Sequence, residues 1–272
     1  MRNLEDFSLE SAASISGILF DVDDTITTNG KLTPEAYAAM ASLKAAHLLV
    51  FAITGRPAGW CDHIARMWPV DGVVGENGAF YFRYDEGAKK MVRRFIVDDS
   101  AREKYRQRMK DVSRMILQAV PGSALASDQP YREADIAIDY CEDVPQLANT
   151  EISRIKLIME REGLTAKISS IHVNGWIGQY DKLTTTQLML EEAFGIDVEA
   201  EKSRFVFVGD SPNDQPMFAF FPNTVGVANV RDFTAQLTTP PAYITHARSG
   251  AGFVEVAEKL LACRLCVPEN NR

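Results

Sequence analysis

The chain has 272 residues, of which 46% are hydrophobic, 29 are basic and 37 are acidic, so its formal net charge is −8 at pH 7. A chain of this size can bury one large core or two smaller ones, whereas its acidic balance argues against broad binding to nucleic-acid backbones. No stretch approaches the roughly 18 apolar residues of a membrane span, and residues 1–16 carry charges without the apolar core of a signal peptide. We therefore expect a cytoplasmic protein that binds neither nucleic acid nor membrane.

The first half of the chain alternates strand-like and helix-like patterns. Ile18–Phe20 is a short apolar run, typical of a strand buried on both faces. Thr33 followed by Pro34 predicts the start of a helix. Apolar strands are then expected over residues 48–53 and 72–74. This β-α-β-α-β order predicts a doubly wound, mostly parallel Rossmann-like sheet in an α/β fold.

The middle of the chain has a different pattern. A helix is expected from about 100 to 119, and a one-sided strand over 134–138, where apolar residues alternate with aspartates. Pro145 is expected to open a second helix that Gly163 closes, and two short strands follow over 166–169 and 171–173. One-sided strands with two helices indicate a separate α+β lobe. From Lys182 the first pattern resumes, with strands over 205–208, 224–227 and 243–245. The predicted organisation is a core over 1–83 and 179–272, with an inserted α+β cap over 84–178.

The four cysteines are too few and too scattered for the disulfide framework of a small secreted protein. Cys263 and Cys266 form a Cys-x-x-Cys pair at the end of an apolar helical pattern. One Cys-x-x-Cys pair without a second such pair is weak support for a zinc site. We therefore expect reduced thiols that bind no metal, and the sequence does not assign a role to them.

Carboxylates and phosphate-compatible groups follow several predicted strands. Asp21 and Asp23 come directly after the first strand, and an extended backbone would point both the same way. Thr54-Gly55-Arg56 follows the second strand, Lys182 opens a later helix, and residues 209–214 follow another strand. Ligands of open α/β sheets bind beyond such strand ends, and clustered carboxylates are ligands that Mg²⁺ prefers. An acidic turn after a buried strand is the alternative for Asp21 and Asp23 alone. Together the groups supply what is needed to position and neutralise a phosphoryl group.

In this order the motifs Asp-x-Asp-x-Thr, Thr-Gly-Arg, Lys and Gly-Asp-x-x-Asn-Asp resemble the haloacid dehalogenase superfamily. The likeness covers the core, about two-thirds of the chain. Glu76-Asn77-Gly78-Ala79 and the long insertion after it resemble the subfamily with a C2-type cap, the Cof-type or IIB group, which includes sucrose-phosphate and mannosyl-3-phosphoglycerate phosphatases. Asp24 departs from the pattern, because the family usually has Gly at this position.

The resemblance implies a role for each matching residue. Asp21 matches the nucleophile that becomes an aspartyl-phosphate, and Asp23 matches the general acid/base. The metal is Mg²⁺, held by Asp21, by the backbone carbonyl of Asp23 and by Asp210, with Asp214 supporting the site from behind or through water. The phosphate-binding residues implied are Thr54, Gly55, Lys182 and Asn213.

Residues that bind the leaving group and select among substrates are expected around the cap. Asn77 lies near the third strand end, and Arg56 follows Thr54, although Arg56 could equally bridge to a carboxylate. In the cap, His172 and Asn174 would share one strand face, Trp176 could stack on a sugar ring, and Arg132 could bind a second anionic group. Packing is the alternative for each of these cap residues.

The predicted function is a Mg²⁺-dependent phosphatase that hydrolyses a small phosphorylated metabolite, most simply a sugar phosphate, through an aspartyl-phosphate on Asp21. One alternative is a phosphomutase of the phosphomannomutase type, which returns the phosphoryl group to its substrate. Another is a non-catalytic metabolite-binding protein on the same fold, which would not need both a nucleophile and an acid/base. The sequence gives neither the substrate nor the oligomeric state.

Overall fold

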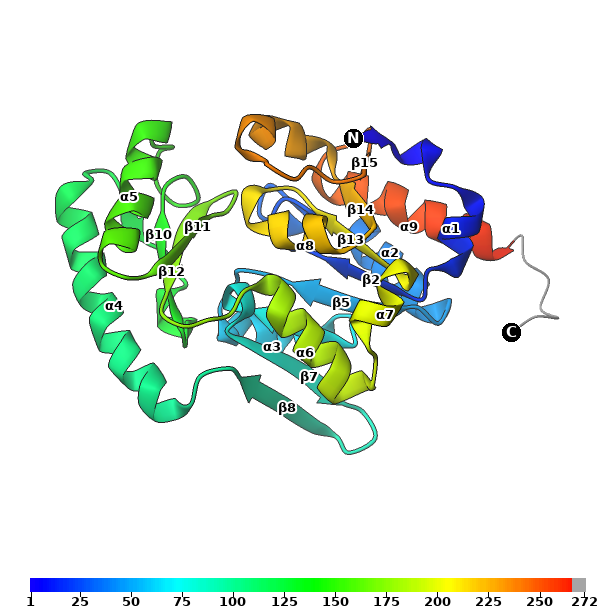
Figure 1. The fold of residues 1–272 in the computed structure, drawn as a ribbon, viewed down its shortest axis with the longest axis horizontal. Helices are drawn as coiled ribbons and strands as arrows, with labels where there is room; N and C mark the ends of the chain where they lie inside the picture. The colour runs from blue at the N-terminus through cyan, green and yellow to red at the C-terminus, as the bar shows by residue number, and fades with distance from the viewer. Residues whose placement is uncertain (266–272) are drawn as a thin grey trace.

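A nine-stranded sheet organises the larger body of the molecule (Figure 1). The computed structural model describes residues 1–265. The strands lie in the order β1-β15-β14-β13-β2-β5-β6-β7-β8, parallel from β1 to β6 and antiparallel where β7 and β8 are added. Their bounds are β1 (Arg2–Asn3), β2 (Gly17–Phe20), β5 (Leu49–Ile53), β6 (Gly72–Gly75), β7 (Phe80–Asp85), β8 (Lys90–Phe95), β13 (Phe205–Gly209), β14 (Asn223–Gly226) and β15 (Tyr243–Ile244). The predicted doubly wound α/β fold is confirmed.

Helices cover both faces of this sheet because the central strands are apolar on both sides. Ile18 and Phe20 of β2 pack into one core with α2, α3 and α9, whereas Leu19 packs into a second core with α6 and α8. The helices are α1 (Leu9–Ser14), α2 (Pro34–Ala45), α3 (Ala58–Met67), α6 (Lys182–Phe194), α7 (Val198–Glu201), α8 (Gln215–Phe220) and α9 (Ser249–Leu265). Thr33 caps α2, as its sequence predicts, by accepting a hydrogen bond from the Ala36 N–H.

Short elements fill the connections of the larger body. A hairpin of β3 (Thr27–Thr28) and β4 (Lys31–Leu32) follows β2. Single turns of 3-10 helix are η1 (Leu4–Asp6), η2 (Glu76–Gly78), η4 (Lys202–Arg204) and η5 (Pro212–Asp214), and η6 (Ala228–Gln236) is longer. Both η2 and η5 directly follow strands of the sheet, which places their polar residues at the ends of those strands.

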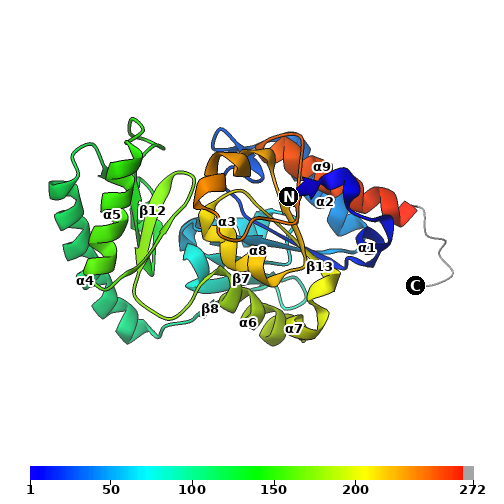
Figure 2. The ribbon, with the colours of Figure 1, turned by 45° about the horizontal axis from the view of Figure 1, so that its top comes forward.

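The smaller lobe is an antiparallel sheet in the order β11-β12-β10-β9, with two helices on one face. Its elements are α4 (Asp99–Ala119), β9 (Ala124–Leu125), η3 (Gln129–Tyr131), β10 (Asp135–Asp139), α5 (Asn149–Arg161), β11 (Thr165–Ile168) and β12 (His172–Trp176). Val173 faces the helices within the lobe core, so the alternating neighbours His172 and Asn174 share the other face. Figure 2 shows α4 and α5 on the outer side of the lobe and the sheet turned toward the larger body.

Two predicted boundaries differ from the observed ones. Residues 84–95 were expected in the lobe, but β7 and β8 extend the large sheet. The three charged residues of β8, Lys90, Arg93 and Arg94, suit an exposed edge strand, because only part of such a strand faces the core. We propose that the lobe begins after β8, near the Asp98 N-cap of α4. Helix α5 begins at Asn149 and not at Pro145.

Glu76 joins the two bodies. Its side chain is fully buried, and its carboxylate accepts hydrogen bonds from the N–H groups of Glu133, Ala134 and Asp135 at the start of β10, as well as from Ala58 at the start of α3. Burial raises the pKa of Glu76 to about 8. The lobe is therefore held on the larger body by backbone donors converging on one buried side chain.

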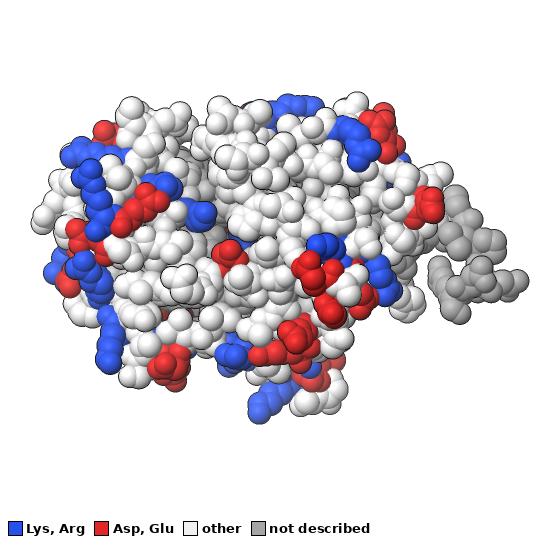
Figure 3. All heavy atoms as spheres, in the orientation of Figure 1, with Lys and Arg blue, Asp and Glu red and all other residues white. Residues whose placement is uncertain are grey.

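The surface carries charged side chains of both signs. On the face that Figure 3 shows, Lys and Arg side chains are interspersed with Asp and Glu. Within residues 1–265, no helix is long and apolar enough to cross a membrane. Cys61, Cys141 and Cys263 are free thiols, and Cys266 lies outside the described residues.

Candidate active site

The carboxyl end of β2 places Asp21 among buried charges. The Asp21 N–H still donates to the Val208 carbonyl of β13, so this residue continues the pairing of the sheet. Lys182 opens α6, and its Nζ lies 2.6 Å from Asp21 Oδ1 and 2.7 Å from Asp214 Oδ1. Burial alone would lower the pKa of Lys182, but the two carboxylates raise it above its ordinary value, so the ammonium group stays charged.

Three carboxylates converge beside this lysine. Oxygens of Asp21, Asp210 and Asp214 all lie within 4.8 Å of one another, and all three residues are buried. Burial raises the pKa of Asp21 and of Asp210 above their ordinary values, and the neighbouring carboxylates add to the effect, while Lys182 opposes it. One ammonium does not neutralise three carboxylates. A divalent cation would supply the missing charge, and all-oxygen donors suit Mg²⁺, so the residues fit the metal that the resemblance implies.

The loop after β13 holds two of these acids in place. Asp214 Oδ2 accepts hydrogen bonds from the N–H groups of Asp210 and Ser211. The carboxylate approaches the backbone so closely that a Cβ on Gly209 would lie 2.4 Å from Asp214 Oδ2. Gly209 is thus required by close packing at the end of the strand. Asp214 contacts Lys182 and this loop, in keeping with the supporting position expected from the sequence.

Asp210 is oriented by Thr25, the last residue of the Asp-x-Asp-x-Thr motif, and by Asn229, which the sequence did not indicate. Its Oδ1 accepts from Thr25 Oγ1 at 3.2 Å, and its Oδ2 accepts from Asn229 Nδ2 at 3.2 Å. Asn229 also donates to the Asp24 carbonyl at 2.9 Å and accepts from the Ser249 N–H. No local motif in the sequence marks Asn229, because its partners are distant along the chain.

Asp24 has a left-handed backbone, with φ of +56°. This conformation explains why the family usually has Gly here, and aspartate is among the few other residues that adopt it readily. The Asp24 N–H donates to Thr27 Oγ1, which ties the turn to the β3–β4 hairpin.

Asp23 points away from the cluster of three carboxylates. Its carboxylate accepts from Arg56 Nε at 2.9 and 3.0 Å, so it is a bridge rather than a cation ligand. Only its backbone is left for a metal, as the resemblance implies. Arg56 is 3% exposed, and its other end donates to Glu142 of the lobe at 2.6 Å. The structure therefore gives Arg56 a bridging position between the two bodies.

Of the predicted phosphate-binding residues, Lys182 contacts Asp21, and Gly55 and Asn213 line a small cavity together with it. Gly55 lies against the Asn77 amide, where an added Cβ would be 3.1 Å from Asn77 Nδ2. Asn213 Nδ2 donates to Asn77 Oδ1, whereas Asn77 Nδ2 is buried without a hydrogen-bond partner among the described residues. A buried amide donor left unpaired is costly, so we propose that this group binds an anionic oxygen of the substrate. Thr54 is fully buried, and its Oγ1 accepts from the Arg56 N–H.

Three of the lobe residues proposed as substrate readers are occupied by internal contacts. Arg132 binds Asp128 and Asp135 and donates to the Gly55 carbonyl, so its guanidinium is already paired. Asn174 donates to Asp135 Oδ2 at 2.9 Å. Trp176 is 1% exposed, and its indole N–H donates to the Tyr180 carbonyl. We therefore propose packing and scaffold roles for these three in place of substrate binding.

We propose His172 as the lobe residue that contacts a substrate. Its Nε2 lies 2.9 Å from Glu142 Oε2, beside Arg56. His172, Asn174 and Arg132 line a small cavity above Asp21, whereas Trp176 does not. Glu142 was missed in the sequence, since it follows β10 without any motif of its own.

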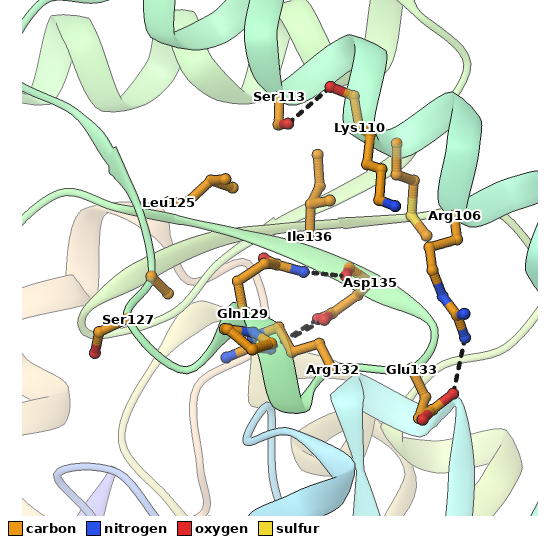
Figure 4. A pocket seen from close by; sticks show the side chains of 13 residues that line it. Arg106, Lys110, Ser113, Leu125, Ser127, Gln129, Arg132, Glu133, Asp135 and Ile136 are labelled. Carbon is orange, nitrogen blue, oxygen red and sulfur yellow. Dashed lines mark hydrogen bonds and ion pairs between the residues drawn. The ribbon is translucent and has the colours of Figure 1, made fainter.

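Another cavity, of about 610 Å³, lies within the lobe between α4 and the start of β10 (Figure 4). Its charged side chains pair with one another, Arg106 with Glu133 and Arg132 with Asp135. It shares only Arg132 with the cavity above Asp21, and none of the buried carboxylates Asp21, Asp210 and Asp214 lines it. We therefore place the candidate active site at the strand ends and not in this cavity.

Comparisons with known proteins agree with this fold. Residues 18–117 match the family model described as haloacid dehalogenase-like hydrolase. No curated protein sequence matches the chain.

Solved structures with the same fold are only distantly related in sequence. A Thermoplasma acidophilum protein, 0175, has a TM-score of 0.67 and 16% identity over 91% of this chain and 98% of its own. The sucrose-phosphatase of Synechocystis sp. PCC6803, solved with sucrose and phosphate, has a TM-score of 0.61 and 16% identity over 90% of this chain and 97% of its own. A subclass IIB sugar phosphatase of the superfamily has a TM-score of 0.60 and 13% identity over 91% and 99% of the two chains. The family match over residues 18–117 and the shared fold agree with the resemblance found in the motifs.

Proposed function

We propose that this chain, which is haloacid dehalogenase-like in its matched residues and in its whole fold, is a Mg²⁺-dependent phosphatase acting on a small phosphorylated metabolite. A sugar phosphate is the substrate class that its fold neighbours favour. The observation that carries the proposal is the contact of Asp21 with Lys182, inside a buried cluster that includes Asp210 and Asp214. A structural role would not require so many buried charges, because each is costly to remove from water.

The proposed reaction has two steps on Asp21. Asp21 Oδ attacks the phosphorus atom, the bond to the leaving oxygen breaks, and Asp23 gives that oxygen a proton. Water then attacks the aspartyl-phosphate while Asp23 takes its proton back, which releases phosphate and restores the carboxylate. Lys182 and the free amide donor of Asn77 hold the phosphoryl oxygens, and Asp21, Asp210 and the Asp23 backbone would hold Mg²⁺, which supplies charge neutralisation.

Phosphate release from a panel of phosphate monoesters, measured with Mg²⁺ and without a bisphosphate activator, tests this proposal. We expect wild type to release phosphate, and Asp21→Asn to release none from any substrate. Asp62→Asn is a matched control, since Asp62 pairs only with surface arginines. Activity in Asp21→Asn equal to that of the control would contradict the nucleophile, and transfer only in the presence of a bisphosphate would indicate a phosphomutase.

A further inference from the structure

The space directly above Asp21 is too small for a leaving group. The cavity lined by Asp21, Asp23 and Arg56, with Ile171 and His172 of the lobe above them, has a volume of about 10 Å³. That is room for about one water molecule. Neither the phosphoryl unit nor the organic group attached to it fits in this space as it stands, and the organic group has room only in neighbouring cavities.

Two larger cavities continue from this point in series. The first, of about 230 Å³, shares Asp23, Arg56 and Ile171 with the space above Asp21. The second, of about 480 Å³, shares Thr27 and Gly30 of the β3–β4 hairpin with the first. The three cavities thus adjoin one another from Asp23 toward α3, and the wall of the first larger one also includes Glu142 and Ile171 of the lobe.

The walls of the inner cavity are acidic. Asp23, Asp24 and Glu142 contribute carboxylates. The cation in this wall is Arg56, which already contacts Asp23 and Glu142. A second anionic group on the leaving group would meet like charge here, whereas hydroxyl groups would find acceptors.

The outer cavity is aromatic and apolar. Trp60 and Trp68 line it with Leu32 and Ile64. Trp60 is 40% exposed, and the Arg56 guanidinium carbon lies 4.3 Å from the centroid of its ring. Pockets that combine aromatic walls with a few polar groups are typical of small-molecule sites, and an indole offers a large, rigid apolar surface for a ring to pack against.

We infer that the cavity around Trp60 and Trp68 is a second leaving-group subsite, which binds a neutral ring one unit beyond the phosphorylated one. The preferred substrate is then a phosphorylated disaccharide or glycoside, with its hydroxyls in the acidic inner cavity and its distal ring on the indoles. This subsite lies on the larger body, on α3 and the β3–β4 hairpin. The inference rests on the proposed phosphatase activity and adds the class of leaving group.

The test is a ratio of rates. For wild type we expect kcat/KM to be highest for a disaccharide phosphate (sucrose 6-phosphate or trehalose 6-phosphate), lower for glucose 6-phosphate and lowest for fructose 1,6-bisphosphate. Trp60→Ala should lower the ratio of disaccharide phosphate to glucose 6-phosphate by about tenfold, which corresponds to ~1.4 kcal/mol. Any disturbance of Arg56 alters both substrates and cancels in this ratio. Trp68→Leu, which leaves the ring beneath Arg56 in place, should lower the same ratio.

Phe220→Ala is the matched control. Phe220 is also a partly exposed aromatic ring facing a cation, Lys202, but it lines none of the three cavities. An unchanged ratio in both tryptophan variants, or a wild-type preference for the bisphosphate, would overturn the subsite.

A second experiment measures binding to the subsite without turnover, by calorimetric titration with unphosphorylated sucrose and trehalose in the presence of inorganic phosphate. If no substrate releases phosphate but either sugar binds wild type and not Trp60→Ala, the phosphatase proposal fails and the subsite stands. If neither sugar binds wild type and the ratio does not change, the subsite fails.

Discussion

Asp23 is the proposed acid/base. Its carboxylate is oriented by Arg56, while the proposed cation site lies among other acids. We predict that Asp23→Asn lowers kcat by roughly 10²–10⁴, the usual size of general acid/base catalysis. Mg²⁺ binding should persist, because the backbone carbonyl is unchanged. Steady-state kinetics with circular dichroism to confirm folding checks this, and a kcat within twofold of wild type would remove Asp23 from the mechanism.

We propose that Asn229 is a positioning residue, which orients Asp210 without contacting the substrate. It donates to Asp210 Oδ2 and to the Asp24 carbonyl, and thereby fixes one proposed metal ligand. Loss of such outer contacts typically weakens metal affinity by 10- to 100-fold. We predict that Asn229→Ala raises the half-saturating Mg²⁺ concentration for activity by at least about tenfold.

Asn223→Ala provides the comparison for Asn229, because Asn223 donates to backbone carbonyls of Ser203 and Phe205 instead. Mg²⁺ titrations of activity on both variants separate positioning from stability. Equal half-saturation in wild type and Asn229→Ala, with only a lower Tm, would leave Asn229 a purely structural residue.

At the scale of elements, Glu142 links the segment after β10 to the larger body. Burial opposes its ionisation, but contacts with His172 and Arg56 outweigh burial and lower its pKa from 4.5 to about 2. A carboxyl group with a lowered pKa in the folded state stabilises the fold above its ordinary pKa. That contribution is lost as the pH falls from about 4.5 toward 2.

We predict accordingly that Glu142→Gln destabilises the protein at pH 7 by roughly 1–3 kcal/mol, since it leaves part of Arg56 uncompensated. The difference from wild type should shrink as the pH is lowered through this window. Urea unfolding at pH 7, 4 and 3 measures this difference. The control is Glu151→Gln of α5, a partly exposed residue paired with Arg154. A difference that is the same at every pH would show that the charge of Glu142 is not what stabilises the contact.

For the whole molecule, the cluster of Asp21, Asp210 and Asp214 predicts a link between cation binding and stability. A cation that binds only the folded state stabilises it by ~2.7 kcal/mol at 100 times its Kd. For a chain of this size the corresponding rise in Tm is roughly 5–10 °C.

Thermal unfolding with EDTA and with excess Mg²⁺ tests this link. Asp210→Asn should abolish the rise in Tm, and it should raise the Tm in EDTA because one of the repelling charges is gone. If wild type unfolds at the same temperature in both buffers, these acids do not form a Mg²⁺ site.

Strand and helix positions could be predicted because they depend on local pattern. The buried run before Asp21, the Thr33-Pro34 helix start and the alternation in β10 each carry a period or a cap that a short window contains. The strand ends then had to meet, since parallel strands share one edge. That is why Asp21, Lys182 and Asp210 could be placed together from sequence.

Tertiary structure alone decided which partner each polar side chain takes. Asp23 faces Arg56, Asp210 is held by Asn229, and Trp176 packs on Tyr180, although the sequence allowed other roles for Asp23 and Trp176. The charged stretch around β8 became an edge strand of the large sheet because its antiparallel pairing with β7 was available there. Such contacts join residues far apart in the chain, and their free energies depend on burial that no local window of sequence specifies.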